Sequence, residues 1–342
     1  RGLGDVYKRQ PLVKKEAEWA ATFSTDGFAT WSYGYVMMLA SEYIMATGDQ
    51  SVMPGLKRLA LESAKGQSAV GTWGHKFAMP NGNLNGYGSM NAPGNTLIIG
   101  MLLAREAGVK DPDLDAAIDK ATKFLRWYVD KGAVPYGDHA PFPMHDDNGK
   151  CSSAAVLFDL LGDVEAATFF AKMATAAHNE REQGHTGNFL NVLWALPGVA
   201  RGGPLATGGY MKEQGWYYDL ARKWDGSFVY QGSPVGEEEH NKYTGWDSTG
   251  CYLLAYGQAY KSLRLTGKKP SIVTPFNAAQ VAEIIDVGRD YAFRDKTVNH
   301  YAKYTPDQLI AKISSWSPIV RKKAGVELAK REGDYIPTLV KL

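Results

Sequence analysis

Apolar residues recur every three or four positions along most of the chain, which is the period of an amphipathic helix. These stretches come in pairs, and the two members of a pair follow one another as the two arms of a helical hairpin do. The pattern therefore predicts an all-α protein that is built from helical hairpins. The pairs span residues 28–47 with 51–65, 95–107 with 113–130, 152–161 with 164–178 and, less regularly, 189–200 with 205–222 and 246–265 with 277–289.

Long connections separate the hairpins. Each hairpin returns the chain to the end where it started, so we expect these connections to emerge on one face and to surround one mouth. Solenoid repeats are uniform in length, whereas the first helices here start 67, 57, 37 and 57 residues apart. The irregular spacing favours a closed α/α toroid over a linear stack. The long connections span residues 67–92, 132–150, 180–187 and 224–245.

Residues 301–342 follow a different pattern. A helix, a Trp-Ser-Pro break at 316–318 and a second helix at 320–331 resemble a HEAT-like repeat, in which a proline opens the second helix. A single repeat of this kind cannot bury its own apolar face. We therefore expect the natural chain to continue beyond Leu342 and this region to offer a surface to a protein partner.

The start of the chain is also unusual. Residues 1–10 carry no apolar periodicity and begin with Arg1 instead of Met, so we interpret them as a non-native tail. This leaves residues 11–300 as the toroid domain, ahead of the HEAT-like repeat. We then expect the natural N-terminus to be missing. Because a signal peptide would lie there, the sequence does not predict the localisation of the protein.

Composition excludes several classes of protein. The chain has 342 residues, of which 44% are apolar and 22% charged, as in an ordinary globular protein. A formal charge of +2 offers no positive surface for nucleic acid. No apolar run reaches the roughly 20 residues of a membrane-spanning helix. Cys151 and Cys251 stand 100 residues apart, which fits neither a disulfide scaffold nor a CxxC metal site.

Titratable side chains gather in the long connections beside aromatic ones, as a ligand pocket requires. His75 follows a Gly-Thr-Trp-Gly turn and is the first candidate for a general acid or base. Asp138 with His139 and Asp225 are the further catalytic candidates. Aromatic and amide side chains nearby suit a polar, sugar-like ligand. The candidate substrate-binding residues are Trp73, Asn85, Tyr87, Tyr136, His185, Asn188, Trp224, Trp246 and Asp247.

These candidates have a structural alternative. Loops carry polar residues in any protein, and the Gly-aromatic turns would also serve to plug the hairpin ends into the core. Asp247 precedes Ser248 and Thr249 at the start of a helix, where an N-cap role competes with a binding role. The asparagines fit loop turns equally well.

Known cofactor motifs are absent from the sequence. HExxH, paired CxxC and GxxxxGK[ST] do not occur. Zinc-dependent prenyltransferases, which share the toroid fold, use an Asp-x-Cys pair, whereas Asp247 and Cys251 are four residues apart. We therefore expect neither a metal nor another cofactor.

Two motifs resemble those of the terpenoid cyclase and prenyltransferase toroids. Residues 67–73 fit the QxxxGxW pattern of the cyclases, and residues 224–228, WDGSF, are similar to a DGSW repeat. The resemblance implies the ring fold. The acidic DxDD motif of the cyclases and the GCGEQ thioester of complement-like toroids are both missing, so the chemistry is not implied.

A second resemblance covers residues 20–342. The phrases GTWGH, HTGNFLNVLWALPGVARGGP, KWDGSF and GWDSTGCYLLAYG are similar to those of a bacterial family described as a domain of unknown function. The family implies an α/α toroid, in some members a C-terminal HEAT-like repeat, and an extracytoplasmic setting. It offers no catalytic residues to transfer.

Three functional hypotheses follow. The first is a hydrolase or lyase that acts on a carbohydrate-like substrate, with His75 as base or acid and Asp138 or Asp225 as partner. The second is a noncatalytic binding or scaffold module, and the third an isoprenoid-type cyclase. Candidate residues that meet around one cavity would favour an enzyme, whereas loop histidines that face solvent would favour binding.

Overall fold

The computed structural model describes residues 3–25, 27–179, 189–232, 244–290 and 299–342, and all regular structure within these ranges is helical. Pairing of the β type is limited there to isolated bridges, such as Ala133 with Phe142. None of the described helices has the length and apolar character that crossing a bilayer requires. The prediction of an all-α protein is confirmed.

The helices follow the predicted hairpins closely. Their bounds are α1 (Leu3–Thr22), α2 (Ala29–Thr47), α3 (Met53–Lys65), α4 (Asn91–Ala107), α5 (Pro112–Arg126), α6 (Lys150–Leu161), α7 (Val164–Ala176), α8 (Phe189–Ala200), α9 (Pro204–Leu220), α11 (Thr249–Gly257), α12 (Ala278–Arg289), α13 (Pro306–Ile313), α14 (Pro318–Leu328) and α15 (Ile336–Leu339). Helix α1 includes residues 3–10, which the sequence pattern set apart as a tail.

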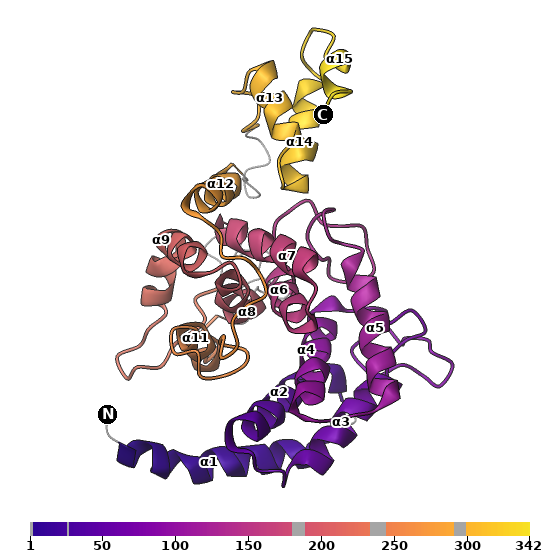
Figure 1. The fold of residues 1–342 in the computed structure, drawn as a ribbon, viewed down its shortest axis with the longest axis vertical. Helices are drawn as coiled ribbons and strands as arrows, with labels where there is room; N and C mark the ends of the chain where they lie inside the picture. Colours follow the sequence, from indigo (N-terminus) through magenta and orange to yellow (C-terminus); the bar gives the residue numbers. More distant parts are fainter. Residues whose placement is uncertain (1–2, 26, 180–188, 233–243, 291–298) are drawn as a thin grey trace.

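The first helices of the first four hairpins, α2, α4, α6 and α8, lie inside the molecule. Helix α2 packs on α4, α4 on α6, α6 on α8 and α8 on α11. Their hairpin partners α3, α5, α7 and α9 lie along the outside of this series (Figure 1). Helices α4 and α6 are apolar on nearly every face and are buried accordingly. The inner helices therefore form a continuous curved core.

Helices α2 and α4 approach each other at two glycines. A Cβ atom added to Gly34 would lie 2.5 Å from the carbonyl carbon of Thr96, and one added to Gly100 would lie 2.8 Å from the carbonyl oxygen of Gly34. Only glycine leaves room for backbones at this distance. The α2–α4 crossing, around which Met37 is fully buried, thus depends on these two positions.

Helix caps occur where the sequence predicts hairpin turns. Asp163 accepts a hydrogen bond of 3.1 Å from the backbone N–H of Ala166 and so caps α7. Ser317 caps α14 in the same way, and Pro318 occupies its first turn. These caps confirm the predicted turn before α7 and the predicted Ser-Pro start of α14.

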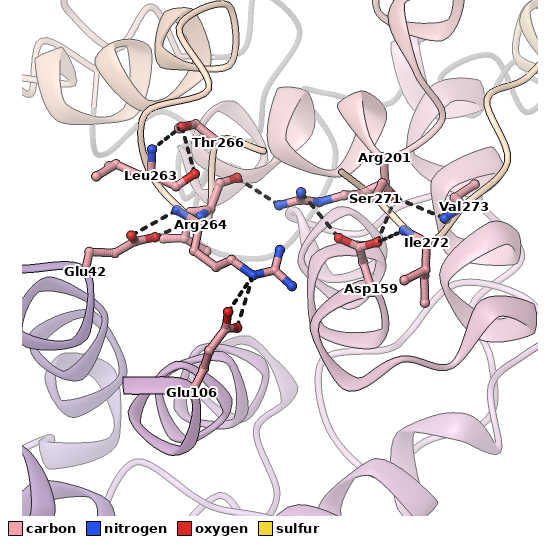
Figure 2. Close-up of polar contacts among 11 residues, drawn as sticks. Glu42, Glu106, Asp159, Arg201, Leu263, Arg264, Thr266, Ser271, Ile272 and Val273 are labelled. Carbon is pink, nitrogen blue, oxygen red and sulfur yellow. Dashed lines mark hydrogen bonds and ion pairs between the residues drawn. The ribbon is translucent and has the colours of Figure 1, made fainter. Parts of the chain in front are cut away.

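An irregular segment at residues 263–276, the strap, follows α11, and Figure 2 shows its polar contacts with Glu42, Glu106, Asp159 and Arg201. Glu42 of α2 accepts hydrogen bonds from the backbone N–H groups of Arg264, at 2.9 Å, and Leu265, at 2.8 Å. The Arg264 side chain pairs with Glu106 of α4 at 3.0 Å, and Lys269 joins the same carboxylate. The strap thus fastens the first two inner helices.

The strap also contacts α6 and the end of α8. Arg201 donates a hydrogen bond of 2.8 Å to the carbonyl oxygen of Leu265 and lies 3.4 Å from the Asp159 carboxylate, and both charged side chains are buried. Asp159 in turn accepts from the Ser271 hydroxyl and the Ile272 N–H, at 2.7 and 2.8 Å. Four inner helices therefore direct their carboxyl ends toward the strap.

This arrangement fixes where the loops lie. Because the carboxyl ends of α2, α4, α6 and α8 gather at the strap, their amino ends gather at the opposite end of the core. The connections at 67–92 and 132–150 lead into the amino ends of α4 and α6, whereas the described parts of 224–245 lead toward α11. The strap also corrects one prediction: the helix expected at 246–265 ends at Gly257, because Arg264 and Leu265 donate their backbone N–H groups to Glu42.

The C-terminal helices α13 and α14 pack on each other and touch the rest of the chain at few points. The Ser317 hydroxyl lies 3.0 Å from Nε2 of the buried His145. Arg321 donates to the side chain of Asp130, just after α5, at 2.8 Å.

Candidate functional site

Three loop segments meet at the amino ends of α4 and α6. We call residues 71–75, 85–91 and 133–139 the mouth cluster. The N–H of Met90 donates to the carbonyl oxygen of Trp73, and the N–H of Asn91 to that of Tyr136, both at 2.8 Å. The buried Asn91 amide donates to two further carbonyl groups of segment 133–139, at 3.0 and 2.7 Å. One asparagine therefore holds two of the predicted loops together.

The aromatic residues of the mouth cluster differ in exposure. Trp73 is buried, and its indole N–H donates to the carbonyl oxygen of Ser63 at 2.9 Å, so it anchors the loop to the core. Tyr87 is 66% exposed and meets Tyr136 edge to face, with ring centroids 5.4 Å apart. Tyr87 and Tyr136 are thus the cluster's rings near solvent.

Three polar candidates of the mouth cluster lie at the surface. The side chains of Asn85, Asp138 and His139 are exposed. The backbone carbonyl of His139 accepts a hydrogen bond of 3.1 Å from the hydroxyl of Tyr128, which fixes the loop end. The sequence-predicted pair of Asp138 and His139 therefore faces water.

His75 is held against aromatic rings. Its ring stacks on Phe28, with centroids 4.6 Å apart, and lies 5.9 Å from the Trp31 ring. The Trp31 indole N–H donates to Nδ1 of His75 at 2.8 Å. Partial burial lowers the pKa of His75, which favours the neutral imidazole. Because Nδ1 accepts a hydrogen bond, the proton of that neutral ring resides on Nε2.

A buried polar layer adjoins the mouth cluster, and sequence reasoning missed its centre. Lys150, in the first turn of α6, is almost fully buried, and its ammonium lies 2.7 Å from the Asp147 carboxylate and 6.0 Å from the ring centroid of Tyr136. The Asn95 amide donates to the Lys150 carbonyl at 2.9 Å. The one signal in the sequence for this pair is the i, i+3 spacing of Asp147 and Lys150 at the start of an apolar helix.

Four further candidates lie elsewhere. Trp224 is 96% exposed, and Asp225 accepts from the N–H and hydroxyl of Ser227 at 2.9 and 2.6 Å, which lowers the pKa of its carboxyl. Trp246 is also exposed. Figure 1 places this region, between α9 and α11, on the opposite side of the molecule from the loop between α3 and α4. The structure does not bring Asp225 to His75.

Asp247 serves the start of α11. Its carboxylate accepts a hydrogen bond of 2.8 Å from the backbone N–H of Thr249, and bonds to Thr249 lower its pKa. Ser248 is the residue at the N-cap position. Asp247, which the sequence offered as the N-cap, thus fixes the helix entry from one residue before the observed N-cap position.

The remaining candidates, His185 and Asn188, lie outside the described residues. Within the part of the chain that the structure describes, no three His, Cys, Asp or Glu side chains are grouped as metal ligands would be. The cavity beside Trp73, Asn91 and Asn95 has a volume of about 10 Å³. That is room for about one water molecule and not for a substrate.

Comparison with known proteins identifies a family to which most of the chain is similar. A family model with the description "Domain of unknown function (DUF6288)" matches residues 5–267. Neither a curated protein nor a solved structure matches the chain. The match covers every helix from α2 to α11 and ends within the strap.

Proposed function

Since the chain belongs to the DUF6288 family, a domain of unknown function, we propose that it is a noncatalytic binding module for a polar, carbohydrate-like ligand. The binding surface would consist of the mouth cluster together with Phe28 and Trp31 at the start of α2. The same proposal includes an α/α toroid for the hairpins and a HEAT-like repeat for α13 and α14.

The observation that carries the proposal is the fixed orientation of His75. The stack on Phe28 and the hydrogen bond from Trp31 hold the imidazole as a neutral ring with an N–H group at Nε2. Among the described residues, no side chain accepts from this N–H. A hydroxyl or carbonyl oxygen of a bound ligand supplies such an acceptor.

The rings around His75 suit the apolar face of a sugar, as its N–H group suits a hydroxyl group. Phe28 is 58% exposed beside the imidazole, and Tyr87 is exposed at the other edge of the mouth cluster. Exposed aromatic faces bind the apolar C–H face of a pyranose, and the exposed amide of Asn85 offers hydrogen bonds to hydroxyl groups. Aromatic rings and uncharged polar groups thus occur together on this surface.

The same geometry argues against hydrolysis or elimination with His75 as the base and Asp225 as its partner, which is one of the predicted pairings. A general base needs a free lone pair, but Nδ1 of His75 already accepts from Trp31. The partner carboxylate Asp225 belongs to the region between α9 and α11, which Figure 1 places across the molecule, and it accepts a hydrogen bond from the N–H of Ser227. An isoprenoid-type cyclase would need a large aromatic cavity, which the roughly 10 Å³ space beside Trp73 does not supply.

The proposal is tested by titrating the protein with a panel of neutral oligosaccharides and by assaying the same mixtures for products. We expect binding without turnover. Replacing His75 or Phe28 with Ala should weaken the affinity about tenfold, as the loss of one stacked or hydrogen-bonded contact does. Trp224→Ala is the matched control, because Trp224 is exposed in the other region.

Two results would contradict the proposal. Affinity that is unchanged in both His75→Ala and Phe28→Ala would place binding elsewhere. Product formation that disappears in His75→Ala would instead support the hydrolase or lyase hypothesis.

A further inference from the structure

A groove separates the outer face of α7 from the C-terminal helices. It has a volume of about 520 Å³, which falls within the range of small-molecule sites. It opens where the chain passes from α5 toward the mouth cluster, but no lining residue belongs to that cluster. The lining residues are Val129, Asp130, Val164, Glu165, Thr168, Phe169, Lys172 and Trp316.

The floor of the groove is apolar. Val129 follows α5, Val164 and Phe169 belong to α7, and Trp316 comes from the turn between α13 and α14. Val164 is exposed although it is a large aliphatic residue. A ligand that covers the exposed parts of these side chains, above all Val164, would gain roughly 25 cal/mol for each Å² of apolar surface removed from water. An apolar molecule of modest size therefore fits this floor.

The charges at the rim are unequally neutralised. Glu165 pairs with Arg126, and Asp130 pairs with Arg321 at 2.8 Å, so both acids already have a cation. The Lys172 ammonium lies 5.7 Å from the ring centroid of Trp316. Within the described part of the chain, no carboxylate lies within ion-pair distance of Lys172. The lining thus retains one positive charge beside an aromatic ring.

We propose that this groove binds a small amphipathic carboxylate. The apolar body of the ligand, aliphatic or aromatic, lies on Val164, Phe169 and Trp316. Its single carboxylate pairs with Lys172, where partial exclusion of water strengthens a charge-assisted hydrogen bond. The inference goes beyond the proposed function, because it assigns a second ligand class to a separate set of residues.

Binding in the groove has a structural consequence. The ligand would touch α7 on one side and Trp316 on the other, and so connect the C-terminal helices to the core. Apart from the groove, the contacts across this boundary include the pair of Arg321 with Asp130 and the contact of Ser317 with His145. A bound carboxylate adds to them.

The test uses isothermal titration calorimetry with three probes: phenylbutyrate, octanoate and the uncharged phenylbutyramide. We expect the two acids to bind at one site and the amide to bind at least about tenfold more weakly, because it lacks the charge that Lys172 recognises. Lys172→Met should remove the preference for the acid. Val164→Glu should weaken the binding of both acids by placing a like charge in the groove.

Lys131→Met is the matched control. Lys131 also lies over a tryptophan ring, 4.2 Å from the centroid of Trp127, but outside the groove. Its replacement should leave all three affinities unchanged. The proposal is overturned if the acid and the amide bind equally, if Lys172→Met keeps the preference, or if Lys131→Met loses it to the same degree. Circular dichroism of each variant verifies the fold.

Discussion

At the scale of single residues, Asp146 shows how the fold perturbs a charge. Its buried carboxylate accepts hydrogen bonds from the N–H groups of Cys151, at 2.8 Å, and Ser152, at 3.2 Å, and from the Ser152 hydroxyl. Burial outweighs these bonds and raises the pKa of Asp146 to about 6. The folded protein therefore holds this proton more tightly than the unfolded chain does.

We expect Asp146→Asn to remove part of the pH dependence of stability. Because its pKa is raised in the folded state, the contribution of Asp146 to the free energy of unfolding is greatest below about pH 4 and is lost as the pH rises through about 6. A shift of about two pKa units corresponds to roughly 3 kcal/mol. Urea unfolding between pH 4 and 7 should show this fall in the wild type and a smaller one in Asp146→Asn. Asp119→Asn, at an exposed position of α5, should keep the full fall.

The sequence predicted only part of the candidate site, because some of its features depend on chain connectivity and others on the surroundings of single residues. Loop length and turn residues indicated that His75 and Tyr136 lie at one mouth, because the connectivity of the hairpins brings their two loops to the same end. The burial of Lys150 was not predictable, because a lysine after a glycine usually faces water. The hydrogen bond from Trp31 to His75 joins residues 44 positions apart, and local patterns carry no signal of it.

At the scale of elements, close helix packing decides where substitutions are tolerated. In α2, a Cβ atom at position 34 would lie 2.5 Å from the backbone of Thr96, whereas one at Gly208 in α9 meets nothing within 4 Å. The two glycines look alike in sequence, since both stand inside a helix. Their surroundings predict opposite effects of the same substitution.

We expect Gly34→Ala to lower the free energy of unfolding by more than about 2 kcal/mol, because the α2–α4 crossing must open. Gly208→Ala should raise it by up to about 1 kcal/mol through helix propensity. Chemical unfolding of the two variants checks both values. Shifts in the same direction would show that the α2–α4 contact is not limiting.

Most helices were predictable within a few residues, because periodicity and caps are local. The exception is α11, which ends earlier than its apolar period predicts. The apolar period continues past Gly257, but the backbone there leaves the helix and donates to Glu42, more than 200 positions earlier. A contact over such a distance overrides local preference and has no local sequence signature.

At the scale of the whole molecule, the C-terminal helices are held to the core by contacts that include the ion pair of Lys312 with Asp290 at 2.9 Å. Arg321 donates to both the carbonyl oxygen and the side chain of Asp130, at 3.0 and 2.8 Å. Exposed ion pairs contribute about 1 kcal/mol or less. This connection can therefore weaken without unfolding of the core.

We expect Arg321→Ala to increase the radius of gyration in small-angle scattering, while the midpoint of thermal unfolding stays almost unchanged. Lys322→Ala, one position along and exposed, should alter neither quantity. An unchanged radius in Arg321→Ala would mean that the remaining contacts, such as Lys312 with Asp290 and Ser317 with His145, suffice to hold the C-terminal helices.

The strap has a consequence for the order in which the chain is made. Glu42 and Leu265 are 223 positions apart, so a ribosome adding about 5–20 residues per second completes their contact only tens of seconds after α2 emerges. Until then, the Glu42 carboxylate lacks the N–H groups that bind it in the folded protein and must stay hydrated. The N-terminal hairpins are thus synthesised early but acquire their final packing late, and chaperones would meet them in that interval.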